Sequence, residues 1–213
     1  DNIDIVFNEL DALFNLELNT GKPLKSPTSL TFIRLGTSGT IQANIELDSL
    51  IVAEAAIGFD NLMHYYEPSM CEHPIAVSLH SKLGMSKNLN HPYYIDGDSV
   101  LVDDCLKLGM SKGIIVTNPG FYAPQGRHLR TKNILPYDLN EFLHFNYKDS
   151  KITNFDMETS GIYGLSHVMG HRAISISAVL ANRFHRTFSN QADKTVFNMI
   201  EKVTNAIKNG FFL

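Results

Sequence analysis

Four short apolar runs, each bounded by turn-forming residues, constrain the fold of this chain more than any other feature. They cover residues 30–35, 50–56, 113–117 and 171–180. Short continuous apolar runs between turn signals are typical of β-strands that are buried on both faces. The first, third and fourth runs lead directly into polar loops. The pattern therefore predicts a buried sheet with polar residues at several strand ends.

Segments with helical character lie around and between these runs. Apolar spacing and capping residues predict helices over residues 1–16, 98–108, 157–170 and 190–209. Strands that alternate with helices are typical of an α/β fold. With 213 residues, the chain is long enough for one such domain. We therefore expect a single domain, residues 1–213, with a central mixed, mostly parallel β-sheet flanked by helices on both faces.

The composition argues against several functional classes. The net charge of −4 provides no basic surface for nucleic acid or an anionic membrane. No apolar run approaches the roughly 20 residues of a membrane span. Cys71 and Cys105 lie in different segments, which indicates reduced, buried thiols and a cytoplasmic protein. The nine histidines include no pair at metal-binding spacing with a third ligand, so we expect no metal site.

The loop expected after the first strand combines an arginine with glycines and hydroxyls. Residues 34–39 read Arg-Leu-Gly-Thr-Ser-Gly. Glycines let backbone amides approach an anion, and a guanidinium matches the geometry of phosphate oxygens. The alternative is a tight turn whose hydroxyls bond to their own backbone. Because Arg34 lies inside an otherwise apolar strand, we favour an anion site.

The loops after the third and fourth apolar runs also carry polar groups. Gln125 and Arg127 flank Gly126, so in extended chain both side chains point the same way. An amide beside a guanidinium can match the carbonyl and N–H edge of a nucleobase, on which Phe121 could stack. Arg183 ends the last strand. The alternatives are a solvated loop with an ordinary core phenylalanine, and an exposed basic turn.

Two carboxylates flank a methionine where the third predicted helix begins. Asp156 is well placed to cap that helix, and this structural role is about as well supported as a functional one. Glu158 lies just inside the helix among residues expected to be buried. An ionised carboxylate is costly there unless a partner binds it. The hydroxyls of a sugar would be a natural partner for Glu158.

Taken together, these motifs resemble the nucleoside phosphorylase superfamily, with uridine phosphorylases as the best match. Residues 34–39 resemble its phosphate loop, residues 121–127 its pyrimidine-recognition stretch, and Asp156–Met157–Glu158 its ribose-binding Glu-Met-Glu. The resemblance extends over nearly the whole chain. It implies the family's three-layer fold and phosphorolysis of the N-glycosidic bond of a pyrimidine nucleoside, with uridine and phosphate yielding uracil and ribose 1-phosphate.

The resemblance also implies a role for each matching residue at the phosphate and the base. Arg34 and Thr37 would bind phosphate, with Thr37 also near the ribose. Phe121 would pack against sugar and base. Gln125 and Arg127 would bind the uracil edge and stabilise the negative charge of the departing base.

At the other positions, Arg183 would stand near the far carbonyl of the base. Asp156, Met157 and Glu158 would hold the ribose, with Glu158 accepting hydrogen bonds from the 2′ and 3′ hydroxyls. Asp156 replaces the glutamate that the family usually has. The resemblance assigns a catalytic part to Arg34, Gln125, Arg127 and Glu158.

One family element has no counterpart in these residues. The family's amino-terminal strands carry a Gly-x-Pro-x-x-Arg-type loop that supplies half of the phosphate site, and no such loop occurs here. We therefore expect a fragment, a proteolysed form or a shortened paralogue. The alternatives are a purine nucleoside phosphorylase, a nucleosidase or an inactive nucleoside-binding paralogue. The absence of an aspartate in Ala181–Asn182–Arg183 favours pyrimidines.

The resemblance further implies how the protein would assemble and what it would need. Family members form dimers that combine into hexamers, so a homo-oligomer is expected. No cofactor is expected, because inorganic phosphate is a co-substrate. Some uridine phosphorylases hold a potassium ion at the dimer interface, although the segments that would supply it are largely absent here.

Overall fold

A mixed eight-stranded sheet forms the centre of the computed structural model, which describes residues 2–85, 91–133, 135, 137–147 and 149–213. Two short strands, β1 (Leu16–Glu17) and β2 (Lys22–Pro23), form a separate hairpin. The strands of the main sheet are β3 (Thr31–Thr40), β4 (Leu50–Gly58), β5 (Tyr93–Asp96), β6 (Ser111–Thr117), β7 (Asn146–Tyr147), β8 (Ser150–Asp156), β9 (Arg172–Asn182) and β10 (Thr187–Phe188).

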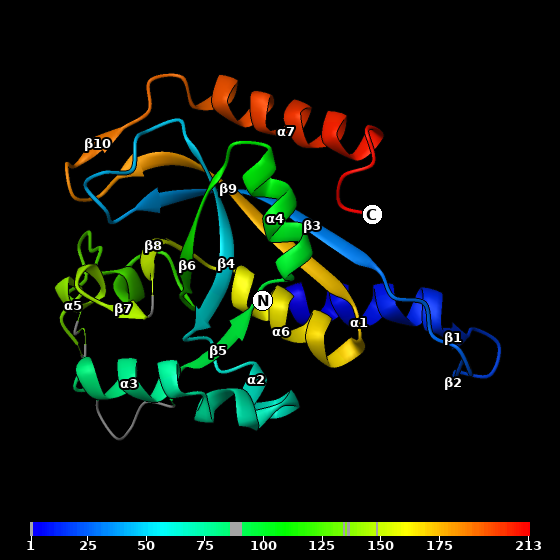
Figure 1. Cartoon of the computed structure of the whole chain (residues 1–213). Coiled ribbons are helices and arrows are strands. Elements are labelled where there is room, and N and C mark those ends of the chain that lie inside the picture. The colour runs from blue at the N-terminus through cyan, green and yellow to red at the C-terminus, as the bar shows by residue number, and fades with distance from the viewer. Residues whose placement is uncertain (1, 86–90, 134, 136, 148) are drawn as a thin grey trace.

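Helices cover the sheet on more than one side, as Figure 1 shows for α7 along one side and α2 and α3 along the other. The α-helices are α1 (Asn2–Asn15), α2 (Met63–Tyr66), α3 (Pro74–Lys82), α4 (Ser99–Lys107), α5 (Asn140–Leu143), α6 (Thr159–Met169) and α7 (Ala192–Lys208). Short 3₁₀ turns occupy Pro68–Glu72 and Ala123–Gln125. In the described part of the chain, no helix is long and apolar enough to span a bilayer.

The expected α/β architecture with a mixed sheet flanked by helices is confirmed. The strand order is β10-β9-β3-β8-β6-β4-β5, and the ladders β3–β9, β4–β6 and β6–β8 are parallel. The sequence did not predict one feature of this sheet. Strand β4 also pairs antiparallel with β9, so the path β9-β3-β8-β6-β4 closes on itself. Closure brings the ends of distant strands together at one rim.

The core consists of three clusters of buried apolar residues, and each cluster includes residues of a different helix. Met199 and Val203 of α7 join a buried cluster with Ile174 and Ile176 of β9. The helix α6 packs on the opposite cluster through Ile162 and Leu165. A third cluster joins Ile75 and Leu79 of α3 to apolar residues of β4, β6 and β8. These clusters fix the strands whose ends carry the polar residues.

The predicted element boundaries were partly right. The helix expected over 98–108 is α4, and the Asp98 carboxylate caps it by accepting from the Leu101 amide at 3.0 Å. The helix expected over 157–170 begins at Thr159 and ends before Gly170, which has a left-handed φ of 75°. The helix expected over 1–16 is α1, which packs on α6 and buries Phe7.

Some elements were missed or misjudged. Residues 36–40 were expected to form a loop, but they continue β3 to Thr40, with a β-bulge between Ser38 and Gly39. Strands β5 and β8 and the helix α3 were not predicted. In the case of β8, the polar residues Thr153 and Asn154 disguise a strand whose polar side chains are buried in hydrogen bonds.

Candidate active site

The strand ends surround a cavity of about 610 Å³. Residues of β3, β8 and β9 and the loop after β6 line it. Ligands in sheets with parallel strands typically bind at such strand ends. The lining includes eight of the residues singled out in the sequence: Arg34, Thr37, Phe121, Gln125, Arg127, Asp156, Met157 and Glu158. Arg183, the ninth, lies directly behind Gln125.

Arg34 lies in the middle of β3, and its side chain folds along the strand over Gly36. The two residues are on the same face because side chains alternate along a strand. A Cβ atom built on Gly36 would lie 2.3 Å from the Arg34 Nη1 atom. The glycine therefore makes room for the guanidinium. This differs from the expected role, in which the glycines of a loop would let backbone amides approach an anion.

The Arg34 guanidinium contacts two carboxylates and one hydroxyl. Its Nη2 atom lies 2.5 Å from Glu158 Oε2 and 3.5 Å from Asp156 Oδ2. Its Nη1 atom donates to Ser175 Oγ at 3.3 Å. Thr37 is exposed, lining the cavity three residues along the same strand. The role of Arg34 and Thr37 as phosphate ligands stays a prediction. In this structure, Arg34 is paired with the carboxylates of Asp156 and Glu158.

Asp156 is buried at the end of β8, and its carboxylate is surrounded by donors. Its Oδ1 accepts from Thr117 Oγ1 at 2.7 Å, and its Oδ2 accepts from the Thr159 amide at 3.1 Å and from the Thr159 hydroxyl. Burial raises the pKa of Asp156, while Arg34 and the two hydroxyls oppose this shift. Asp156 thus accepts from the first amide of α6, as considered, although the cap position itself is Glu158, whose side chain makes no cap hydrogen bond. The contact of Asp156 with ribose remains a prediction.

Glu158 occupies the cap position of α6 rather than the buried interior that the sequence suggested. Its side chain is 36% exposed. The cost of burying a lone carboxylate therefore does not apply, because solvent and Arg34 both reach it. Met157 and Glu158 both line the cavity and also border a smaller pocket beside α1. The position leaves Glu158 free to meet a ligand from the cavity.

At the opposite end of the cavity, two arginines converge on one glutamine. Gln125 is buried, and its Oε1 accepts from Arg127 Nη1 at 2.6 Å and from Arg183 Nη1 at 3.2 Å. Arg183 also donates to the Gln125 carbonyl oxygen. The Arg127 guanidinium stacks 3.9 Å above the Phe121 ring centroid. Gln125 and Arg127 lie together as predicted, but not in extended chain: a 3₁₀ turn over Ala123–Gln125 is followed by Gly126 with a left-handed φ of 74°.

These two guanidiniums have no acidic partner among the residues that the structure describes. Burial lowers the pKa of Arg127, and burial together with the charge of Arg127 lowers the pKa of Arg183 to about 10. The contribution of Arg127 to the lowered pKa of Arg183 shows that the two positive charges lie close together. Crowded, uncompensated positive charge makes this end of the cavity suited to a ligand that carries or develops negative charge.

Several cavity residues were not found from the sequence. Phe155, Leu180 and Phe188 line the cavity, and the Phe188 side chain is 79% exposed at its mouth. Phe155 lies under Arg183, whose guanidinium is 5.0 Å from the ring centroid. No local signal separates such residues from ordinary core positions, because their exposure depends on how the strands pair.

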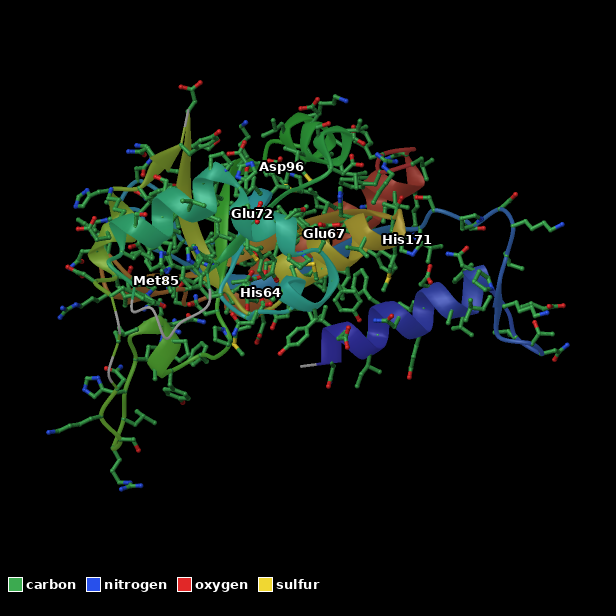
Figure 2. The ribbon with its side chains drawn as sticks, turned by 90° about the horizontal axis from the view of Figure 1, so that it is seen from below. His64, Glu67, Glu72, Met85, Asp96 and His171 are labelled. Atoms are coloured by element: carbon green, nitrogen blue, oxygen red, sulfur yellow. The ribbon has the colours of Figure 1, made fainter. Side chains whose placement is uncertain are left out.

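The cysteines and histidines lie outside this cavity. Burial raises the pKa of both free thiols, that of Cys105 to about 12, which agrees with the expected reduced, buried cysteines. His64 lies on the underside near Glu67 and Glu72 in Figure 2, and its Nε2 is 2.8 Å from the His91 carbonyl oxygen. Within the described ranges, no three potential metal ligands come together.

The fold and the cavity together define a class of protein, an α/β protein with a polar cavity where strand ends meet. A family model described as the phosphorylase superfamily matches residues 24–209. The chain therefore belongs to the phosphorylase superfamily, as the resemblance of its motifs implied.

Two curated relatives are both uridine phosphorylases. The protein from Thermococcus kodakarensis is 29% identical over 167 residues, which cover 77% of this chain and 53% of the relative. The protein from Haemophilus influenzae is 24% identical over 182 residues, which cover 83% of this chain and 63% of the relative. The chain thus spans between about half and two thirds of the length of these relatives.

Solved structures support the fold. A Trypanosoma brucei nucleoside phosphorylase, described as showing uridine phosphorylase activity, superposes with a TM-score of 0.83 at 23% identity. The match covers 99% of this chain and 77% of that one. The uridine phosphorylase of Schistosoma mansoni in its apo form gives a TM-score of 0.60 at 20% identity, covering 97% and 67% of the two chains.

Proposed function

We propose that this cavity binds a pyrimidine nucleoside and phosphate and catalyses phosphorolysis of the N-glycosidic bond, converting uridine and phosphate to uracil and ribose 1-phosphate. The observation that carries the proposal is the pair of guanidiniums, Arg127 and Arg183, that converge on Gln125 without a carboxylate. In this reaction the base leaves as an anion. A site with fixed positive charge stabilises that anion more than the neutral nucleoside, which is the requirement for catalysis.

The hydrogen bonds at Gln125 define what the base would meet. Because Arg127 and Arg183 both donate to its Oε1, the amide nitrogen of Gln125 is the group left to donate to a ligand. Arg127 offers further N–H groups in the same region. Donors of this kind suit the carbonyl oxygens of uracil, over which the negative charge spreads when the bond breaks. Phe121 provides an aromatic surface beside them.

The opposite end of the cavity suits the sugar and the nucleophile. Arg34 and Thr37 would hold phosphate, one of whose oxygens attacks C1′. The electron pair of the breaking C1′–N1 bond goes to the base, and water supplies the proton that yields neutral uracil. Glu158 would accept hydrogen bonds from the ribose hydroxyls beside Met157 and so align C1′ with the phosphate. No protein general acid is required when the base leaves as an anion.

The end of β9 and the residue after it favour a pyrimidine over a purine. A purine leaving group would gain from an acidic side chain near N7, and residues 181–183 contain none. Asn182 is buried and committed elsewhere, since its amide nitrogen donates to the Ile45 and Gln42 carbonyl oxygens at 3.0 and 3.2 Å. The two uridine phosphorylase relatives support the same substrate class. We further propose that the chain assembles into a homo-oligomer, since closed symmetric assemblies are the usual arrangement of oligomeric enzymes.

The first experiment measures base release by the 213-residue chain from uridine and from inosine, each with and without phosphate. The proposal expects uracil release that depends on phosphate and exceeds hypoxanthine release. Uracil release without phosphate would indicate a nucleosidase, and preference for inosine would indicate a purine phosphorylase. Uridine that raises the melting temperature without being cleaved would identify a nucleoside-binding protein that lacks this activity.

A further inference from the structure

The two carboxylates that contact Arg34 differ sharply in their surroundings. The Asp156 side chain is 1% exposed and the Glu158 side chain 36%. Asp156 lies in the wall of the cavity, whereas Glu158 stands at the start of α6 with solvent access. A partner that must bind a substrate has to be able to leave Arg34, and a partner that holds Arg34 must stay. Exposure therefore suggests different roles for the two acids.

A chain of buried hydroxyls connects Arg34 to Asp156 by a second route. Arg34 Nη1 lies 3.3 Å from Ser175 Oγ, which lies 2.7 Å from Thr159 Oγ1. The Thr159 hydroxyl is in turn bonded to Asp156 Oδ2. Asp156, Thr159 and Ser175 are all buried, and the residues Ser175 and Thr159 are at most 1% exposed. Water therefore cannot replace these contacts.

The direction of every hydrogen bond in this chain follows from its two ends. A guanidinium can only donate and an ionised carboxylate can only accept. Arg34 therefore donates to Ser175, Ser175 donates to Thr159, and Thr159 donates to Asp156. On the other oxygen, the Ser160 amide donates to Thr117 at 3.0 Å, and Thr117 donates to Asp156 at 2.7 Å. Each hydroxyl donates once and accepts once, so the network is complete without a ligand.

The same count leaves Asp156 little capacity for a sugar. One carboxylate oxygen accepts from Thr117, and the other faces two donors of Thr159 and the guanidinium of Arg34. Binding a ribose hydroxyl would require breaking one of these buried bonds. Among the described residues, the hydrogen-bond partner of the Glu158 carboxylate is Arg34.

We propose that Asp156 is a positioning residue that holds Arg34 for phosphate through the Thr159–Ser175 hydroxyl chain, while Glu158 is the exchangeable partner that Arg34 releases when ribose binds. This inference rests on the proposed phosphorolysis and assigns Asp156 to the phosphate rather than to the sugar. The shorter aspartate, where the resembled family has glutamate, keeps the carboxylate within reach of Thr117 and Thr159.

The experiment compares Thr159→Val, which removes the hydroxyl at nearly constant shape, with Thr159→Ser, which keeps it. Asp156→Asn is tested beside them. We expect Thr159→Val and Asp156→Asn to raise the KM for phosphate about tenfold, the equivalent of one charge-assisted hydrogen bond. Their KM for uridine should be unchanged, and Thr159→Ser should restore the phosphate KM. A rise confined to the KM for uridine would overturn the inference and return Asp156 to the ribose.

Calorimetric titration with inorganic phosphate separates this inference from the proposed reaction. If the unaltered chain binds phosphate but releases no base, the proposed function fails, while weaker phosphate binding by Thr159→Val and normal binding by Thr159→Ser still support the positioning role. Equal phosphate binding by both variants, or none by the unaltered chain, would overturn it. Thermal unfolding of each variant identifies any that has lost its fold. If Asp156→Asn does not fold, the result for Thr159→Val decides.

Discussion

The two ends of the cavity hold their arginines in opposite ways. At the end proposed to hold sugar and phosphate, one guanidinium, Arg34, lies between the carboxylates Asp156 and Glu158. At the end proposed to hold the base, Arg127 and Arg183 share a neutral amide oxygen of Gln125. The first end carries more negative than positive charge, and the second carries only positive charge among these groups. Both ends are built from side chains that meet where the strands end.

This difference teaches what each end is prepared for. The charge of Arg34 is compensated by carboxylates, and such a pairing can be exchanged for an incoming phosphate or hydroxyl group. Unpaired positive charges are held in place by packing on Phe121 and Phe155, even though each charge opposes the other. Such an arrangement is unfavourable until an anion forms beside it, which matches a transition state better than a ground state.

The largest effect on activity is expected when one of the two arginines at Gln125 is removed. Arg127→Ala should lower kcat/KM for uridine about 100-fold, because a donor to the developing anion is lost. Arg130→Ala is the matched control, since Arg130 is exposed and does not line the cavity. Steady-state kinetics with saturating phosphate make the measurement. Equal kcat/KM values for Arg127→Ala and the unaltered chain would mean that this end does not bind the base.

A smaller effect on activity is expected when a methyl group displaces Arg34 and no charge is removed. Gly36→Ala places a methyl group where the Arg34 guanidinium lies, so the arginine must move away from its carboxylates. We expect the KM for phosphate to rise about tenfold, as for one lost charge-assisted hydrogen bond. In an Arg34→Ala background the same glycine change should have no further effect. Additive losses in this double-mutant cycle would contradict the steric explanation.

The smallest effect is on stability. Removing an arginine should stabilise the protein at one end of the cavity and destabilise it at the other. Arg127→Met removes one of two like charges while Arg183 still donates to Gln125, so the melting temperature should rise by about 2 °C. Arg34→Met leaves Asp156 buried without its counter-ion and should lower stability by about 1 kcal/mol, since the acid can take up a proton instead. Thermal unfolding in phosphate-free buffer tests both. A similar loss in the two variants would remove the contrast.

Much of the cavity could be predicted because strand ends are visible as local patterns. Polar groups stood out because Arg34 lies inside the first apolar run and because Gln125 and Arg183 follow the third and fourth runs. The general rule that such ends share one rim then placed the side chains in one cavity. What failed was the conformation of residues 36–40, because a strand containing glycines and hydroxyls resembles a loop until a neighbouring strand supplies its hydrogen bonds.

The partners of each charged group could not be predicted, because they come from distant parts of the chain. Arg34 meets Ser175 across 141 residues and Glu158 across 124, and Arg183 meets Gln125 across 58. Neither periodicity nor spacing encodes such pairings. The environment of Glu158 was misjudged for the same reason, since helical spacing alone indicated a buried position.

The sequence by itself determined the α/β class, the strand ends and the identity of the polar side chains gathered there, because these depend on short-range patterns of burial and turn formation. Only the tertiary structure decided that Asp156 is buried while Glu158 is exposed, that Gly36 makes room for Arg34, and that Arg127 and Arg183 share Gln125 without an acid. The physical reason is that charge pairing and burial are properties of the space between strands, which exists only after the sheet has closed.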